Sequence, residues 1–146
     1  MLKKKCLQLA ILLAYMTYAD VLPALGQTRS DDVEQAFARA TRLHESGDIE
    51  GAIRGYQSIL ARRPERVDVR SNLGAAYSRL GRYEEAIAQY KEALKVDGRN
   101  QTIRFNLALA YYKGALFNEA ADELTRFLTA AAPYVYAAHL RALGLA

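Results

Sequence analysis

Few side chains in this chain could do chemistry, and their spacing assembles neither a catalytic nor a metal site. The two histidines, His44 and His139, lie in opposite halves of the chain, and neither has a histidine or cysteine at metal-ligand spacing. Cys6 is the single cysteine, which excludes an internal disulfide. The neighbouring carboxylates Glu84 and Glu85 would point about 100 degrees apart on a helix, where they suit a helix start rather than acid–base catalysis. We therefore expect no enzyme, no cofactor and no metal.

The charge balance argues against a nucleic-acid partner. The 146 residues contain 20 Lys plus Arg and 16 Asp plus Glu, which gives a formal net charge of +4, and 51% of the residues are hydrophobic. Three of the cations are Lys3, Lys4 and Lys5 at the N-terminus, and the remaining charges are mixed in sign. The composition is that of one globular domain without a concentrated basic surface.

Residues 1–26 have the pattern of a secretory signal peptide. A basic start precedes an apolar run over residues 6–18, and the small residues Ala24 and Gly26 suit a signal peptidase. The run is about 13 residues long, whereas a bilayer span needs about 20. We expect export to the periplasm or the outside of a bacterial cell, with no membrane span after cleavage. An uncleaved segment that anchors the chain is the alternative.

A 34-residue period organises the chain after the short linker at 27–32. The aligned sets include Ala52, Ala86 and Ala120; Leu60, Leu94 and Leu128; Tyr56, Tyr90 and Leu124; and Gly47, Gly81 and Ala115. Each period holds two runs with apolar residues three and four apart, which is typical of amphipathic helices. The glycines fall between the two runs, where glycine ends a helix. The period predicts an all-α array of helix-turn-helix hairpins with repeats at 33–66, 67–100 and 101–134.

The middle repeat resembles the tetratricopeptide repeat (TPR) family. It carries the motif residues Leu73, Gly74, Tyr77, Gly81, Tyr83, Ala86, Tyr90 and Ala93. The first repeat departs from the motif with Arg39 and Ala40 in place of Leu-Gly, and the third has Ala115 in place of glycine. The resemblance implies a right-handed superhelical solenoid that acts as a non-catalytic scaffold and binds a protein or peptide on its concave side.

In arrays of this family the first helix of each hairpin lines the concave groove. Here these helices offer two amides and two cations at equivalent positions one repeat apart, next to an apolar strip. The candidate binding residues are Asn72, Arg79, Phe105, Asn106, Leu109, Tyr112 and Lys113. Such a groove suits a peptide with an acidic group beside apolar side chains. The alternative is that the asparagines bond to neighbouring backbone and that Leu109 packs on the next hairpin.

The family's carboxylate clamp for Hsp70 and Hsp90 tails is not matched. Its positions fall at Phe37, Thr41, Asn72, Thr102 and Asn106, and only Asn72 agrees in type. The main expectation is therefore an exported scaffold for another protein or peptide. The alternative function is a docking module of a longer enzyme, transport or assembly protein of which this chain is a fragment.

Residues 135–146 predict a terminal helix or a truncated fourth repeat. Apolar residues dominate this segment, whereas solenoid ends usually carry a polar capping face. Three explanations stay open: the chain is part of a longer array, the end is covered by a partner or by self-association through this C-terminal helix, or the segment is a short docking helix with a frayed tail.

Overall fold

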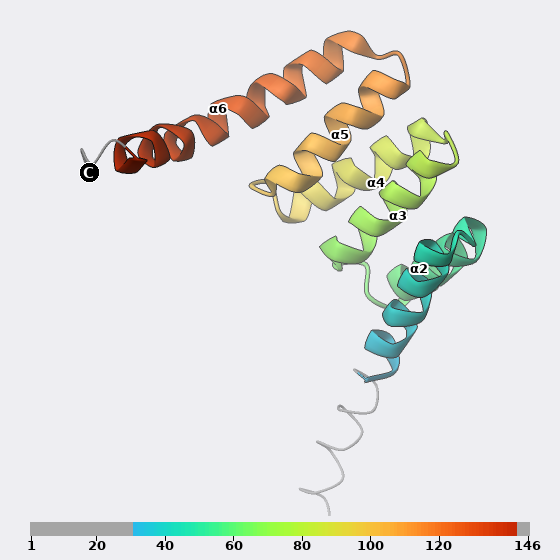
Figure 1. Cartoon of the computed structure of the whole chain (residues 1–146). Coiled ribbons are helices and arrows are strands. Elements are labelled where there is room, and N and C mark those ends of the chain that lie inside the picture. Colours follow the sequence, from blue (N-terminus) through green and yellow to red (C-terminus); the bar gives the residue numbers. More distant parts are fainter. Residues whose placement is uncertain (1–30, 143–146) are drawn as a thin grey trace, which may run out of the picture. The chain divides into compact units, whose positions relative to one another are not determined.

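The computed structural model describes the backbone of residues 31–142 and the side chains of residues 31–130, and the described part contains helices and no strands (Figure 1). A helix over residues 31–46 precedes α2 (Ile49–Arg62), α3 (Val67–Arg79), α4 (Tyr83–Val96), α5 (Gln101–Lys113) and α6 (Phe117–Ala142). The chain divides into two compact units, up to Ala36 and from Phe37 onwards, and the second unit holds α2 to α6. The predicted signal peptide, residues 1–26, lies outside the described residues.

Within the second unit, consecutive helices pair into hairpins. The helix that ends at residue 46 pairs with α2, α3 pairs with α4, and α5 pairs with α6. Each hairpin also packs on the next one, through α2 against α3 and α4 against α5. This succession confirms the predicted all-α array of helical hairpins.

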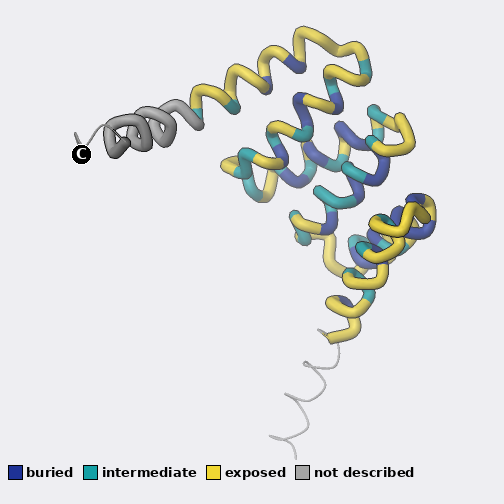
Figure 2. The backbone as a smooth tube through the Cα atoms, viewed as in Figure 1, coloured by how far each residue is buried: buried dark blue, intermediate teal, exposed yellow. Residues whose placement is uncertain are grey.

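Small residues at the aligned positions let the two helices of a hairpin approach closely. Ala52, Ala86 and Ala120 are 0%, 0% and 3% exposed, and they belong to the dark-blue core in Figure 2. Gly74 has a similar role, because a Cβ built on it would lie 2.7 Å from Cε1 of Tyr90 on the facing helix. A larger side chain at these positions would force the helices apart.

The turns inside the hairpins have the left-handed backbone that the glycines predict. Gly47 and Gly81 have φ angles of 94° and 73°. Ala115 occupies the equivalent position in the third hairpin with φ 61°, although it carries a Cβ. The third turn therefore keeps the geometry of the other two without their glycine.

The last helix differs from the sequence expectation. α6 has 26 residues, whereas α2 and α4 have 14 each. The sequence predicts a separate helix or partial repeat from residue 135, but the backbone stays helical through Pro133 to Ala142. Residues 130–132 are all alanines. Alanine has the highest helix propensity of any residue type, so this run favours a continued helix over a break.

Candidate binding groove

Two hollows lie along the first helices of the hairpins. The smaller has a volume of about 260 Å³ and is lined by Thr41, His44, Glu45, Tyr56, Asn72 and Arg79. The larger has a volume of about 530 Å³ and is lined by Val67, Asp68, Ser71, Asn72, Asp97, Asn100, Thr102 and Ile103. Asn72 on α3 contributes to both hollows. We call the two hollows together the groove beside α3.

Tyr56 lies at the base of the smaller hollow. It is 0% exposed, and its ring centroid is 6.1 Å from that of Phe37 and 6.2 Å from that of His44. Its hydroxyl donates a hydrogen bond to Oγ1 of Thr41 over 3.4 Å. Burial raises the pKa of Tyr56, while hydrogen bonds with Thr41 and Asn72 act in the opposite direction. The phenol is therefore a neutral hydrogen-bonding group at the base of the groove.

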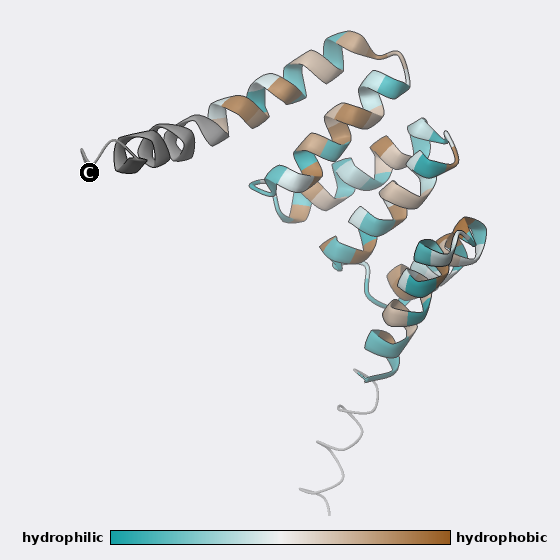
Figure 3. Cartoon of the chain, viewed as in Figure 1, coloured by the Kyte–Doolittle hydropathy of each residue, from teal (hydrophilic) through white to brown (hydrophobic). Residues whose placement is uncertain are grey.

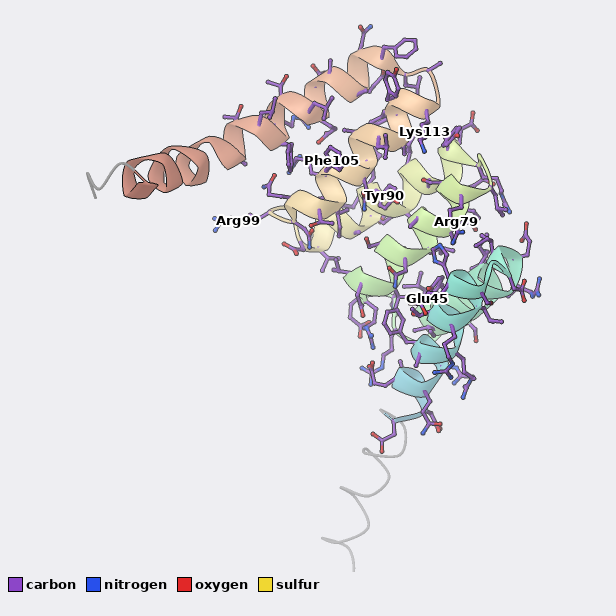
Figure 4. All side chains as sticks on the ribbon, in the orientation of Figure 1. Glu45, Arg79, Tyr90, Arg99, Phe105 and Lys113 are labelled. Carbon is purple, nitrogen blue, oxygen red and sulfur yellow. The ribbon has the colours of Figure 1, made fainter. Side chains whose placement is uncertain are left out.

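Arg79 lines the same hollow and is held there by a hydrogen bond. Its Nη1 donates a hydrogen bond of 2.9 Å to the backbone carbonyl of His44, which ties α3 to the first hairpin. Burial and the nearby positive charge of Arg79 lower the pKa of His44, against the opposing effect of Glu45. The hollow thus contains a carboxylate and a guanidinium around a neutral imidazole, and Figure 4 labels Glu45 and Arg79.

The larger hollow contains carboxylates that already have partners. Arg66 donates two hydrogen bonds to Asp68, from Nε to Oδ1 over 2.8 Å and from Nη2 to Oδ2 over 2.7 Å. These hydrogen bonds lower the pKa of Asp68. Nδ2 of Asn100 donates to Oδ2 of Asp97 over 3.0 Å. These hydrogen bonds hold both carboxylates in place.

The predicted binding residues separate into two groups. Asn72 and Arg79 line the groove at α3, and Asn106 is half-buried on α5. The other five lie on α5 and line neither hollow: Phe105, Asn106, Leu109, Tyr112 and Lys113.

Two residues of the predicted apolar strip contact α6. The ring of Phe105 lies 5.5 Å from that of Phe127, and the ring of Tyr112 lies 5.7 Å from that of Phe117, centroid to centroid. Leu109 is 41% exposed and Lys113 is exposed. The strip is therefore partly engaged within the last hairpin, and its role in binding stays a prediction.

Three polar or aromatic groups of the groove, Tyr56, Asp97 and Asn100, are not among the binding residues predicted from the sequence. Tyr56 belongs to one of the aligned sets of the period, yet it also lines the smaller hollow and its hydroxyl bonds to Thr41. Asp97 and Asn100 belong to the connection between α4 and α5, which lies beside the start of α5. The sequence offered one signal for these two residues: they end one period and stand next to the first helix of the following repeat.

Two family profiles match the chain, one described as tetratricopeptide repeat over residues 43–90 and one as TPR repeat over residues 79–114. The chain contains tetratricopeptide repeats. The matched segments include the end of the first predicted repeat, the middle repeat and the start of the third.

Solved structures share the TPR fold. A crystal structure of MamA superposes with a TM-score of 0.66 at 19% identity. The superposition covers 71% of this chain and 57% of the MamA chain. The first TPR of Spaghetti (RPAP3), bound to the HSP90 peptide SRMEEVD, superposes with a TM-score of 0.64 at 17% identity. This superposition covers 67% of this chain and 78% of the RPAP3 chain. The Yersinia enterocolitica type III secretion translocator chaperone SycD superposes with a TM-score of 0.66 at 23% identity, and the superposition covers 79% of this chain and 89% of the SycD chain. At these identities the likeness shows the fold.

One curated protein is also similar in sequence. The probable UDP-N-acetylglucosamine–peptide N-acetylglucosaminyltransferase SEC of Arabidopsis thaliana is 34% identical over 78 residues. The match covers 53% of this chain and 8% of the plant protein, so the chain spans a small part of that relative. The similarity concerns repeats and says nothing of an activity in this chain.

Two further properties bear on the type of site. Over the described residues, no three His, Cys, Asp or Glu side chains gather into a group that could hold a metal ion. In the same part of the chain, no helix combines the length and hydrophobicity that a bilayer span requires.

Proposed function

We propose that this chain is a non-catalytic scaffold that binds an extended segment of another protein in the groove beside α3. The observation that carries the proposal is the pair of hollows that meet at Asn72. An amide at this position can donate to and accept from the backbone of an extended peptide. Support also comes from the RPAP3 repeat, which has the same fold and is bound to a peptide.

The ligand that fits Arg79 and the exposed residues of α5 has an acidic group beside apolar side chains. One of the five guanidinium donors of Arg79 bonds to the His44 carbonyl, so the others are available for a carboxylate. Lys113 adds a second exposed cation on α5. Phe105 and Leu109 are 45% and 41% exposed beside it and would cover apolar side chains of the ligand. The mismatched clamp positions argue against an Hsp70 or Hsp90 tail as the ligand.

The experiment that tests this function compares partner capture by the wild-type chain and by the double variant Asn72→Ala, Asn106→Ala. Each asparagine contributes about 1 kcal/mol of hydrogen bonding, so the double variant should recover its partner about tenfold less well or worse. Asn118→Ala, an exposed asparagine at the start of α6, is the matched control and should capture like the wild type. Equal capture by all three proteins would remove the groove assignment.

We further propose that residues 1–26 direct export and that the mature chain acts in the periplasm or outside the cell. The basic start, the apolar run and the small residues before position 27 support this localisation. Mass spectrometry of the chain recovered from an expressing bacterium would then show an N-terminus at Gln27. Recovery of the intact chain from the membrane fraction would instead support the uncleaved anchor.

The second candidate function is a docking module within a longer enzyme, transport or assembly protein. The observation that favours it is the match to 8% of the plant transferase, in which the similar segment is a minor part of the whole. A reading frame that continues well past Ala146 in the native gene would favour this alternative over the independent scaffold.

A further inference from the structure

The outward side of α6 exposes positions that are buried in the earlier hairpins. Tyr56 on α2 and Tyr90 on α4 are 0% and 2% exposed, whereas Leu124 at the equivalent position of α6 is 37% exposed. Ile49 at the start of α2 is 8% exposed, but Phe117 at the start of α6 is 60% exposed. In the earlier hairpins the next first helix, α3 or α5, packs against the second helix. Among the described residues no helix follows α6 to do the same.

These exposed positions form a regular stripe along α6. Phe117, Ala121, Leu124 and Leu128 are all exposed and are spaced four, three and four residues apart. The sequence continues the same spacing with Ala131, Val135, Ala138 and Ala142. Apolar residues alternately three and four apart are the seam of a coiled coil. We call these eight positions the α6 stripe, and hydrophobic colours recur along the described half of the helix in Figure 3.

Contacts with α5 fix the orientation of the stripe. Glu123, which is 9% exposed, accepts hydrogen bonds from Nη1 of Arg104 and from Nη1 of Arg126, each over 2.8 Å. Phe127 stacks against Phe105 on the same side of α6. Because α6 cannot rotate without breaking these contacts, Ala121, Leu124 and Leu128 face away from α5, whereas Phe117 at the start of the stripe also contacts Tyr112 of α5.

The first hairpin of another copy does not fit the stripe. Arg39 and Arg42 are exposed there, at positions that are occupied in α3 by the buried residues Leu73 and Ala76. Head-to-tail stacking of two copies would bury both guanidinium groups against apolar side chains, which is costly without partners. A second α6 instead offers an apolar stripe of the same spacing.

The charges along α6 favour an antiparallel pair. The first two turns of the helix carry Glu119 and Asp122 on exposed positions. The charged or titratable residues of the final turns are His139 and Arg141. An antiparallel arrangement brings the acidic start of one helix near the basic end of the other and also opposes the two helix dipoles favourably.

We propose that two copies of this chain associate through antiparallel packing of their α6 stripes. The spacing pairs Leu124 of one copy with residue 135 of the other, and Leu128 with residue 131. In this register Leu128 lies opposite an alanine and Phe117 opposite the alanine at 142, while Ala121 lies opposite the alanine at 138. The interface leaves the groove beside α3 free, so it is separate from the proposed peptide binding.

Light scattering of the full chain after gel filtration tests the association. The wild type should have twice the mass of one chain, and Leu128→Glu should have the mass of one chain because two carboxylates would be buried in the seam. Val96→Glu on α4 is the matched control, since Val96 is 59% exposed and Leu128 is 63% exposed, and it should remain a dimer. A monomeric wild type, or a dimeric Leu128→Glu chain with a wild-type helical spectrum, would overturn the proposal.

Cysteine cross-linking tests the direction of the helices without destabilising the fold. In a Cys6→Ser background, chains with Leu124→Cys should form a disulfide with chains carrying Val135→Cys. Neither variant should cross-link with itself, because the two copies of residue 124 lie about 16 Å apart along an antiparallel pair. Efficient self-cross-linking of Leu124→Cys would contradict the antiparallel pairing, as would the absence of the mixed disulfide in a mixture that is dimeric by light scattering.

Discussion

Within residues 31–142, Ala115 is the non-glycine residue with a positive φ angle. Its φ of 61° falls in the left-handed region, where a Cβ costs about 1 kcal/mol relative to glycine. We expect Ala115→Gly to raise the free energy of unfolding by about 0.5–1 kcal/mol, because strain relief exceeds the greater chain entropy of unfolded glycine. Urea denaturation followed by circular dichroism measures the change.

The reverse substitution in the preceding turn is the control for this prediction. Gly81 has φ 73°, and a Cβ built on it would meet no atom within 4 Å, so Gly81→Ala adds backbone strain without a steric clash. It should lower the free energy of unfolding by about 1 kcal/mol. Opposite signs for the two substitutions would establish backbone conformation as the cause, whereas a destabilised Ala115→Gly chain would count against it.

His44 makes the stability of the first hairpin sensitive to acid. Burial and Arg79 lower its pKa below the usual 6.5, so the unfolded chain binds a proton at a higher pH than the folded chain does. Stability is therefore complete above about pH 6.5 and is lost as the pH falls from there through the folded pKa. His44→Gln should remove part of this loss in thermal denaturation between pH 7 and pH 5. An identical pH dependence in both proteins would show that His44 is not responsible.

At the scale of the helices, the sequence predicts most of the array, because the same turn chemistry recurs in each period. Gly47 and Gly81 have the left-handed backbone expected of them, and α2 and α4 end before Pro64 and Gly98. The end of α6 was not predictable from the period, because Pro133 suggests a break while the alanines before it favour helix. Local propensity decided the outcome there.

The groove was predictable only in part, for a similar reason. The resemblance to the TPR family assigns Asn72 and Arg79 to the concave side, and both line a hollow. It does not reveal that Tyr56 extends a hydroxyl to the groove, since the same residue satisfies the packing pattern. Nor does it show that the rings of Phe105 and Tyr112 contact rings of α6, because contacts between helices depend on side-chain direction as well as spacing.

The pairing of α5 with α6 depends on a half-buried ion pair. Glu123 and Arg104 have side chains that are 12% and 17% exposed, and their atoms lie 2.8 Å apart. Glu123→Ala leaves Arg104 without this partner between the helices and should cost about 1–3 kcal/mol of unfolding free energy. Glu119→Ala, an exposed carboxylate on the same helix, should change the stability by less than about 0.5 kcal/mol. Similar losses for both variants in urea denaturation would contradict the importance of the ion pair.

At the scale of the whole array, the cost of overpacking depends on the position of the hairpin. Ala86 is 0% exposed in a hairpin that has neighbours on both sides, so Ala86→Leu should cost about 1–3 kcal/mol. Ala120 is 3% exposed at the equivalent position of the last described hairpin, where α5 alone among the described helices packs on α6 and leaves it more room to shift. Ala120→Leu should therefore cost less, as measured by the midpoint of urea denaturation. An unchanged midpoint for Ala86→Leu would contradict the close approach of the helices.

The length of α6 has a further consequence for how the molecule is used. A helix of 26 residues is about 39 Å long, roughly twice the length of α5. Two copies joined along such a long helix would hold their grooves at a fixed distance, whereas a flexible linker would not. A ligand that carries its recognition sequence twice, at matching separation, would then bind with an avidity that neither groove provides alone.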